Sequence, residues 1–209
     1  MRIYVDLIIV SLMLLYLPDV RNLKLYSILI FSLSGGLCAL FSQISVGIAL
    51  VKYALNGILF SLLYGGQSQI PLTIIIIFVV LLDELVFVRA PENVFPPFIL
   101  AALLGGLGEP FPLMSYPLYI PALGILYLLF RRLIKLRFIL SVLLITLIIP
   151  TAFPGAFFTA LLISAYPGLS ATGRYREIAS GLALGYLIAH YGIIGIFPYL
   201  LVKGVVSWF

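Results

Sequence analysis

Five charged side chains interrupt long apolar runs of this sequence and could therefore do chemistry away from bulk water. Lys52 lies in the middle of SVGIALVKYALNG, Asp83 and Glu84 end the run IIIIFVVLLDELVFVR, Glu109 closes LLGGLGEP, and Lys203 lies in FPYLLVKGVVSWF. Each such charge in a membrane span costs about 2.5–3.5 kcal/mol, so the charges that persist usually face an interior or serve a function. Carboxyl and ammonium groups in such places suit acid–base catalysis or the binding of a transported solute or ion.

Structural roles explain some of these charges equally well. Glu84 and Lys203 lie close enough to the end of an apolar run for a long side chain to reach water. Asp83, the residue before Glu84, could pair with Lys52 or with Arg89. A structural ion pair at Asp83 is as consistent with the sequence as a functional one.

The sequence offers no pattern typical of a metal or cofactor site. His190 has no second His, Cys or acid at ligand spacing, and Cys38 is the only cysteine. No glycine-rich phosphate loop or dinucleotide fingerprint occurs. The excess of five positive charges need not indicate nucleic acid, because membrane proteins collect such charge in cytoplasmic loops. We therefore expect no metal, no cofactor and no nucleic-acid partner.

The composition predicts an integral membrane protein. Hydrophobic residues make up 64% of the 209 residues and charged residues 9%, with a mean hydropathy of +1.26. Soluble domains are about half apolar and about a quarter charged. No polar stretch is long enough for a soluble domain, so we expect one integral membrane domain over residues 1–209. It would contact the lipid bilayer as a multi-pass protein of the plasma (cytoplasmic) membrane.

Apolar segments that could carry this domain follow one another along the whole chain, and we expect all of them to be helical. The candidates are 3–18, 25–41, 45–64, 70–89, 95–108, 117–130, 136–150, 153–169, 178–191 and 193–208. Several are shorter than the roughly 20 residues that cross a bilayer comfortably. The predicted fold is thus an all-α polytopic transmembrane bundle of about 8–10 spans, some short or re-entrant. The best re-entrant candidate is FPPFILAALLGGLGEP, which is short, glycine-rich and bounded by prolines.

Two further patterns bear on how these helices are arranged. The positive-inside rule places the basic loop FRRLIKLR in the cytoplasm whether residues 95–108 span or re-enter. The small-residue stretches SLSGGL and SGLALG predict close helix packing.

Two stretches together resemble the type IV prepilin peptidases, a family of GxGD intramembrane aspartyl proteases. In LLYLPDVRNLKLYSILI, Asp19 follows the first span and precedes a basic residue and the second span, like that family's first catalytic segment. Gly106-Leu107-Gly108-Glu109 resembles the GxGD motif, with glutamate in place of aspartate and Pro110 following.

The resemblance implies an intramembrane endopeptidase that cleaves a membrane-inserted protein such as a prepilin. Asp19 and Glu109 would form the catalytic pair, with Asp83 as the substitute acid and Gly106 and Gly108 as supporting residues. Two nearby carboxyls in a low dielectric can share one proton and divide the acid and base roles. The extra methylene of Glu109 displaces its carboxyl, and a misplacement of about 1 Å can cost about 100-fold in rate.

Two weaker resemblances point to other intramembrane proteases. LLDELVFV followed by GLGEPFPLMSY is similar to the presenilin-type arrangement and would pair Asp83 with Glu109. GLALGYLIAHYGIIGIFPYLL is similar to the closing helices of CAAX-type (CPBP) proteases. That family needs an EExxxR motif and two histidines, which DELVFVR approximates only with the wrong spacing. A member of this kind would lack the activity.

Two alternatives to an enzyme stay open. The chain could be a small solute or ion-coupled transporter in which Lys52, Asp83 and Glu84 are the intramembrane charges. That hypothesis predicts that Lys52 and an acid line one cavity near the midplane. The chain could also be a non-catalytic scaffold or assembly subunit related to a CAAX protease.

Overall fold

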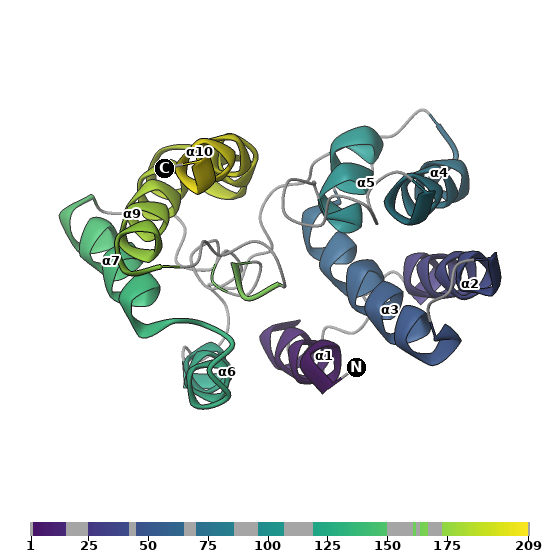
Figure 1. Ribbon diagram of the computed structural model, residues 1–209, viewed down its shortest axis with the longest axis horizontal. Coiled ribbons are helices and arrows are strands. Elements are labelled where there is room, and N and C mark those ends of the chain that lie inside the picture. The colour runs from purple at the N-terminus through teal and green to yellow at the C-terminus, as the bar shows by residue number, and fades with distance from the viewer. Residues whose placement is uncertain are drawn as a thin grey trace. The chain divides into compact units, whose positions relative to one another are not determined.

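In the computed structural model, the regular elements of the described residues are helices. It describes residues 2–15, 25–41, 45–64, 70–85, 96–106, 119–149, 161, 164–166 and 173–208, and nothing is stated below about the structure of the others. The elements are α1 (Arg2–Leu15), α2 (Leu25–Phe41), α3 (Val46–Leu63), α4 (Leu72–Leu85), α5 (Pro97–Gly105), α6 (Tyr119–Phe130), α7 (Leu136–Ile148), α9 (Arg174–Tyr191), the 3-10 turn η4 (Gly192–Gly195) and α10 (Ile196–Trp208) (Figure 1).

The all-α prediction is confirmed for the described ranges, and each of these helices overlaps a predicted apolar segment. The segment 25–41 coincides with α2, whereas α9 begins at Arg174, four residues before the predicted 178. Within those ranges, no helix is both long enough and apolar enough to span a bilayer.

Helix α5, the shortest α-helix among the described residues, lies in the segment that the sequence identifies as the re-entrant candidate. Pro97 is its first residue, and its C-cap is Gly106, whose φ of 102° suits a residue without a Cβ atom. Its nine residues measure about 14 Å along the axis. This is about half the thickness of a typical hydrocarbon core.

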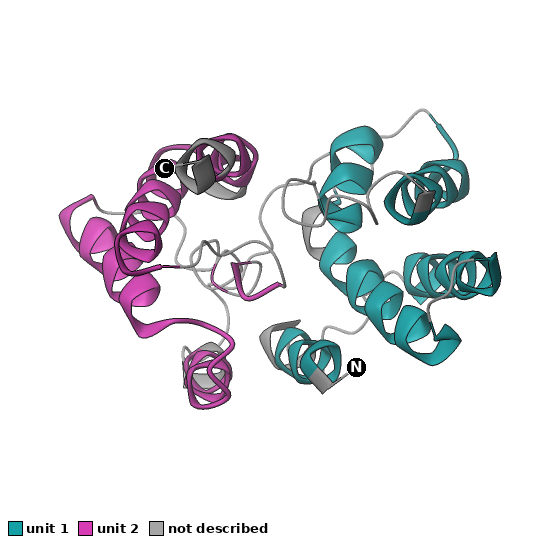
Figure 2. Cartoon of the chain, viewed as in Figure 1, with its two compact units in different colours: residues 1–109 teal, residues 110–209 magenta. Residues whose placement is uncertain are grey.

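The chain divides into two compact units, Met1–Glu109 and Pro110–Phe209 (Figure 2). The sequence predicts one membrane domain over residues 1–209, and whether the two units together form it stays a prediction. Each unit is described separately here.

In unit 1, four helices form a ring. Helices α3 and α4 each pack against both α2 and α5, so they lie diagonally across the ring from each other (Figure 1). Helix α1 packs on α3. Helix α3 is the central element, because every residue from Leu55 to Ser61 is buried. A helix buried on all sides belongs to the interior of a bundle.

Glycines let α2 and α3 approach closely. A Cβ atom on Gly57 would lie 2.5 Å from Cα of Ile28, so the two backbones touch at this crossing. Gly35, in the SLSGGL stretch, lies directly against the ring of Tyr53. The predicted role of SLSGGL in close helix packing is confirmed.

In unit 2, α7 and α9 pack together in the same way. A Cβ atom on Gly181 would lie 2.6 Å from the carbonyl oxygen of Phe138, and one on Gly185 would lie 3.1 Å from that of Val142. The SGLALG stretch thus also mediates close packing, as predicted. After η4 the chain turns back, and α10 packs along α9.

Candidate functional site

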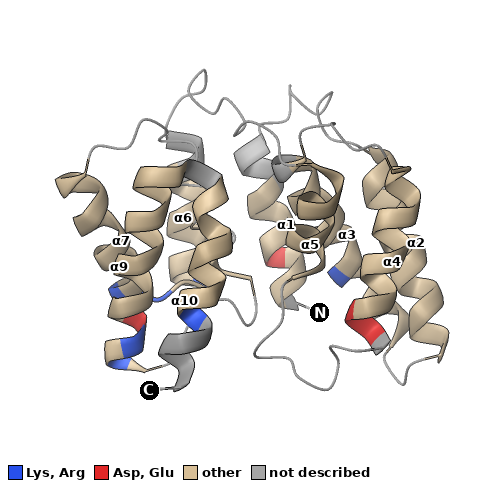
Figure 3. Ribbon diagram, turned by 90° about the horizontal axis from the view of Figure 1, so that it is seen from above, with Lys and Arg blue, Asp and Glu red and all other residues tan. Residues whose placement is uncertain are grey.

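Unit 1 brings together three of the charged residues that the sequence singles out. Lys52 of α3 reaches Asp83 and Glu84 at the end of α4. Figure 3 shows the acidic end of α4 alongside the basic position on α3. Gly106 ends α5, whereas Asp19, Gly108 and Glu109 lie outside the described residues. The structure therefore gives no geometry for the pair Asp19–Glu109 or for Asp83–Glu109.

The three charges and Tyr53 form one hydrogen-bonded cluster, which we call the charged quartet: Lys52, Tyr53, Asp83 and Glu84. Lys52 Nζ lies 2.6 Å from Asp83 Oδ2 and 3.6 Å from Glu84 Oε1. Tyr53 Oη lies 2.7 Å from each of the same two carboxylate oxygens. The Lys52 ammonium also lies 4.7 Å from the centre of the Tyr53 ring, within the range of a cation–π interaction.

The positions of these residues along their helices explain why the quartet needs a cation. Asp83 and Glu84 lie in the last turn of α4, where the helix dipole disfavours negative charge. Helix α4 itself contains no basic residue. The opposite charge comes from α3 instead, across the diagonal of the ring. Of the two partners that the sequence allows for Asp83, the structure shows Lys52, and Arg89 lies outside the described residues.

Tyr53 reaches the two acids because α2 makes room for it. The ring of Tyr53 is fully buried and lies against Gly35, where any side chain would collide with it. Gly35 thus positions the phenol whose hydroxyl joins Asp83 and Glu84.

Asn56, one turn after Lys52, connects α3 to the start of α5. Its Nδ2 donates to the carbonyl oxygen of Lys52 at 2.9 Å, and its Oδ1 accepts the backbone N–H of Phe98 at 3.2 Å. The first N–H groups of a helix have no partner within the helix, and Asn56 satisfies one of these in α5.

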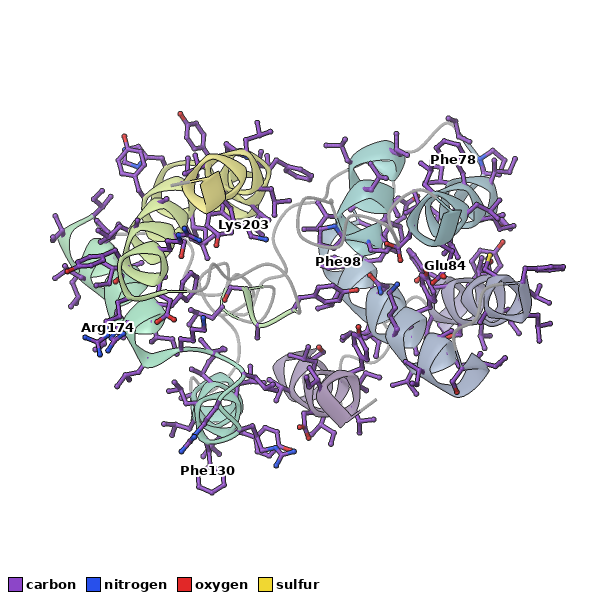
Figure 4. All side chains as sticks on the ribbon, viewed as in Figure 1. Phe78, Glu84, Phe98, Phe130, Arg174 and Lys203 are labelled. Carbon is purple, nitrogen blue, oxygen red and sulfur yellow. The ribbon has the colours of Figure 1, made fainter. Side chains whose placement is uncertain are left out.

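The quartet is most buried at Glu84. The side chains of Lys52 and Asp83 are 22% and 14% exposed, and that of Glu84 is 2% exposed. Figure 4 shows Glu84 directed from α4 toward the interior of unit 1. Among the described side chains, Glu84 Oε2 is the one buried nitrogen or oxygen atom without a hydrogen-bond partner. Buried polar atoms are rarely left unpaired, so this oxygen calls for an explanation.

Sequence reasoning misses Tyr53 and Asn56, and it identifies Gly35 only as part of the packing stretch SLSGGL. The available signal is the spacing: Asn56 follows Lys52 by four residues and so shares its helix face, and Tyr53 adjoins Lys52. The register between α2 and α3 brings Gly35 to Tyr53. No local sequence pattern predicts this register.

Unit 2 holds a second ion pair of ordinary character. Lys135 Nζ lies 2.9 Å from Glu177 Oε1, with side chains 33% and 13% exposed. His190 is exposed, and its Nδ1 lies 3.2 Å from the carbonyl oxygen of Tyr186. Neither feature involves a residue of the quartet.

No protein-family model matches the chain, and no curated protein or solved structure matches it significantly.

Proposed function

We propose that this chain is a multi-pass protein of the cytoplasmic membrane. Its composition supports this, and so does the outer face of α2. Leu29, Leu33 and Leu37 recur every four residues on that face and are 60%, 62% and 60% exposed. Contiguous apolar surface of this kind is unusual on a protein surrounded by water and natural against lipid.

The interior of unit 1 supports the same proposal. Ser27, Asn56 and Ser61 are buried, and the hydroxyls of Ser27 and Ser61 lie 3.2 Å apart between α2 and α3. Membrane helices associate through small residues and interhelical hydrogen bonds, because lipid is as apolar as leucine. Polar contacts between the helices and leucines on the outer face are the arrangement expected of helices surrounded by lipid.

Within this membrane protein, we propose that unit 1 is a small cation-coupled carrier and that the charged quartet is its coupling site. The observation that carries the proposal is the charge imbalance: one lysine faces two carboxyl groups. Unpaired buried charge is costly, so two ionised carboxylates beside one lysine would need a further cation to balance them. With both carboxyl groups ionised, one further cation would bring the net charge of the quartet to zero. Intramembrane acids that pair with lysines commonly mark ion pathways.

The endopeptidase hypothesis stays a prediction, with Asp19 and Glu109 as its catalytic pair. Asp83, its substitute acid, has Oδ2 engaged by both Lys52 and Tyr53. Co-expression with a tagged prepilin, with Asp19→Asn and Glu109→Gln as variants, tests the catalytic pair directly.

Transport by purified protein in proteoliposomes tests the carrier. Solid-supported-membrane electrophysiology records transient currents when solutes from several classes are added in turn: amino acids, organic anions, sugars and inorganic cations. We expect at least one class to evoke a current with the wild type, and Lys52→Met to abolish it. Glu177→Gln, which breaks the ion pair of unit 2, is the matched control and should keep the current.

Two results would contradict the proposal. One is the absence of any solute-dependent current from wild-type protein whose folding is verified by a cooperative thermal transition. The other is an undiminished current from a folded Lys52→Met variant.

A further inference from the structure

The two short contacts of Tyr53 Oη fix a proton count for the quartet. A phenol carries one hydrogen, and an ionised carboxylate can only accept hydrogen bonds. Both contacts measure 2.7 Å, which is the usual distance for a direct O–H···O bond. One hydrogen cannot lie on both lines. With two ionised carboxylates, one of the two contacts would place bare oxygens against each other.

From this count we infer that Asp83, Tyr53 and Glu84 form a chain that holds one additional shared proton, and that the cation coupled by the carrier is a proton. Tyr53 then donates to one carboxyl and accepts a hydrogen bond from the other. The formal charge of the quartet becomes zero: one ammonium, one carboxylate and one carboxylic acid. The use of this proton for transport rests on the proposed carrier function, whereas its presence in the quartet does not.

The surroundings of the two acids assign the proton to Glu84 in the state described here. Asp83 Oδ2 lies 2.6 Å from the Lys52 ammonium, which stabilises the carboxylate form. Glu84 lies 3.6 Å from that ammonium, and its side chain is 2% exposed. Its unpartnered Oε2 suits the carbonyl oxygen of a neutral acid, because leaving a neutral oxygen unpaired costs less than leaving a charged one unpaired.

Proton movement along this chain needs no other reactant. A proton that arrives at Asp83 passes from Oδ2 to Tyr53 Oη, while the hydrogen already on Oη passes to Glu84 Oε1. One O–H bond breaks and one forms at each step, and Tyr53 ends as a neutral phenol. Lys52 balances the carboxylate that remains on Asp83. The more exposed acid is thus the entry point, and the buried acid is the storage point.

Other groups near the quartet leave this count unchanged. Helices α2 and α5 pack against α4, and α3 reaches it through Lys52 and Tyr53 of the quartet. Helix α2 contributes the Cys38 thiol, which interacts electrostatically with Glu84, and α5 has no titratable side chain. From α1, Tyr4 interacts electrostatically with Lys52. None of these adds a second cation to the quartet.

Infrared difference spectroscopy of the protein in lipid at neutral pH tests the shared proton. The wild-type minus Glu84→Gln spectrum should show the carbonyl stretch of a protonated carboxyl group. Selective ¹³C labelling of glutamate carboxyls should shift that band, and labelling of aspartate carboxyls should not. Tyr53→Phe keeps both acids and removes the bridging hydroxyl, so the band should change frequency even if Glu84→Gln does not fold. Glu177→Gln should leave it unchanged.

Proteoliposomes loaded with a pH-sensitive dye test the coupling. With a transported solute, the wild type should acidify the lumen as solute enters, and Glu84→Gln should reduce acidification to the level of protein-free vesicles. Solute transport without acidification would overturn the coupling role of the proton while leaving the carrier in place. A glutamate acid band without any solute transport would establish the proton site and contradict the carrier. Absence of the band from wild type, or its persistence unchanged in both Glu84→Gln and Tyr53→Phe, would overturn the inference itself.

Discussion

Tyr53 gives the quartet a property that an ordinary ion pair lacks. Lys52 and Asp83 alone would form a neutral salt bridge, and Glu84 alone would be an isolated buried acid. The hydroxyl of Tyr53, 2.7 Å from each carboxyl group, connects them into one hydrogen-bonded unit. Removal of any one member therefore changes the environment of the other three.

The Lys52→Met substitution tests how strongly the charges depend on one another. Loss of one partner of a buried pair typically costs 3–5 kcal/mol, and partial exposure of Lys52 and Asp83 places our expectation at about 3 kcal/mol. Unfolding in mixed micelles measures this free energy. The double variant Lys52→Met/Asp83→Asn should be less destabilised than the sum of its single variants, and simple additivity would contradict the coupling.

The ion pair of unit 2 provides the comparison. Lys135 is about a third exposed, so Lys135→Met should change the unfolding free energy by at most about 1 kcal/mol. An equally large loss in both variants would show that the exposure of the pair does not govern its contribution.

The Tyr53→Phe substitution isolates the hydroxyl from the ring. The ring would keep its packing against Gly35, so the helices should retain their arrangement. Glu84 Oε1 would lose its short hydrogen bond, and we expect destabilisation by about 1–3 kcal/mol for a buried group left unpaired. Circular dichroism should stay at the wild-type level while the unfolding midpoint falls. A loss of helical signal would instead assign Tyr53 a packing role.

Among the elements, α2 provides the surface against which the quartet forms. It packs on both α3 and α4, and its Gly35 faces the Tyr53 ring. Neighbouring glycines on this helix differ in what lies opposite them. Gly35 faces a rigid aromatic ring. A Cβ atom on Gly36 would instead lie 2.9 Å from Cδ2 of Leu50, at the end of a flexible side chain.

This difference predicts unequal effects for two adjacent glycine substitutions. Gly35→Ala should destabilise unit 1 by about 1–3 kcal/mol, as overpacking of a rigid site does, and should displace Tyr53 from the acids. Gly36→Ala should have a much smaller effect, because Leu50 can change rotamer. Both replacements carry the same gain in helix propensity, so the difference in their unfolding midpoints reports the contact alone. Equal midpoints would contradict the packing described for Gly35.

Over the whole molecule, the two sides of α2 imply different surroundings. Leu33 and Leu37 are exposed, while Gly35 and Phe31 of the same helix are buried. In unit 2, Tyr175 is 87% exposed between Arg174 and Arg176. Both surfaces are exposed. The exposed face of α2 carries leucines over several turns, whereas Tyr175 lies between two arginines.

Spin labels distinguish the solvents at these positions. In a Cys38→Ala background, labels at positions 33 and 37 should be accessible to oxygen and protected from a water-soluble nickel complex, because oxygen concentrates in the hydrocarbon region of the bilayer. A label at position 175 should show the reverse. Similar access of the nickel complex to all three labels would contradict the membrane proposal.

Sequence reasoning identifies the helices and the charged candidates but not the relationship among them. The apolar runs predict where helices occur because each run between Pro, Gly or polar breaks is long enough for one. Asp83 can be paired with Lys52 on paper, since both interrupt apolar runs. That Tyr53 joins them depends on the crossing of α2 and α3 at Gly35 and Gly57, which is a long-range property. Local patterns carry no information about which faces of two distant helices meet.

Asn56 connects the start of the short helix α5 to the backbone of α3 at Lys52. Its amide holds the first free N–H of α5 with one end and the carbonyl of Lys52 with the other. Sliding of α5 along α3 would separate the N–H of Phe98 from Asn56 Oδ1, whereas the bond from Asn56 Nδ2 to the carbonyl of Lys52 lies within α3. The nine-residue helix α5 is thus held near its N-terminal end by Asn56 of α3.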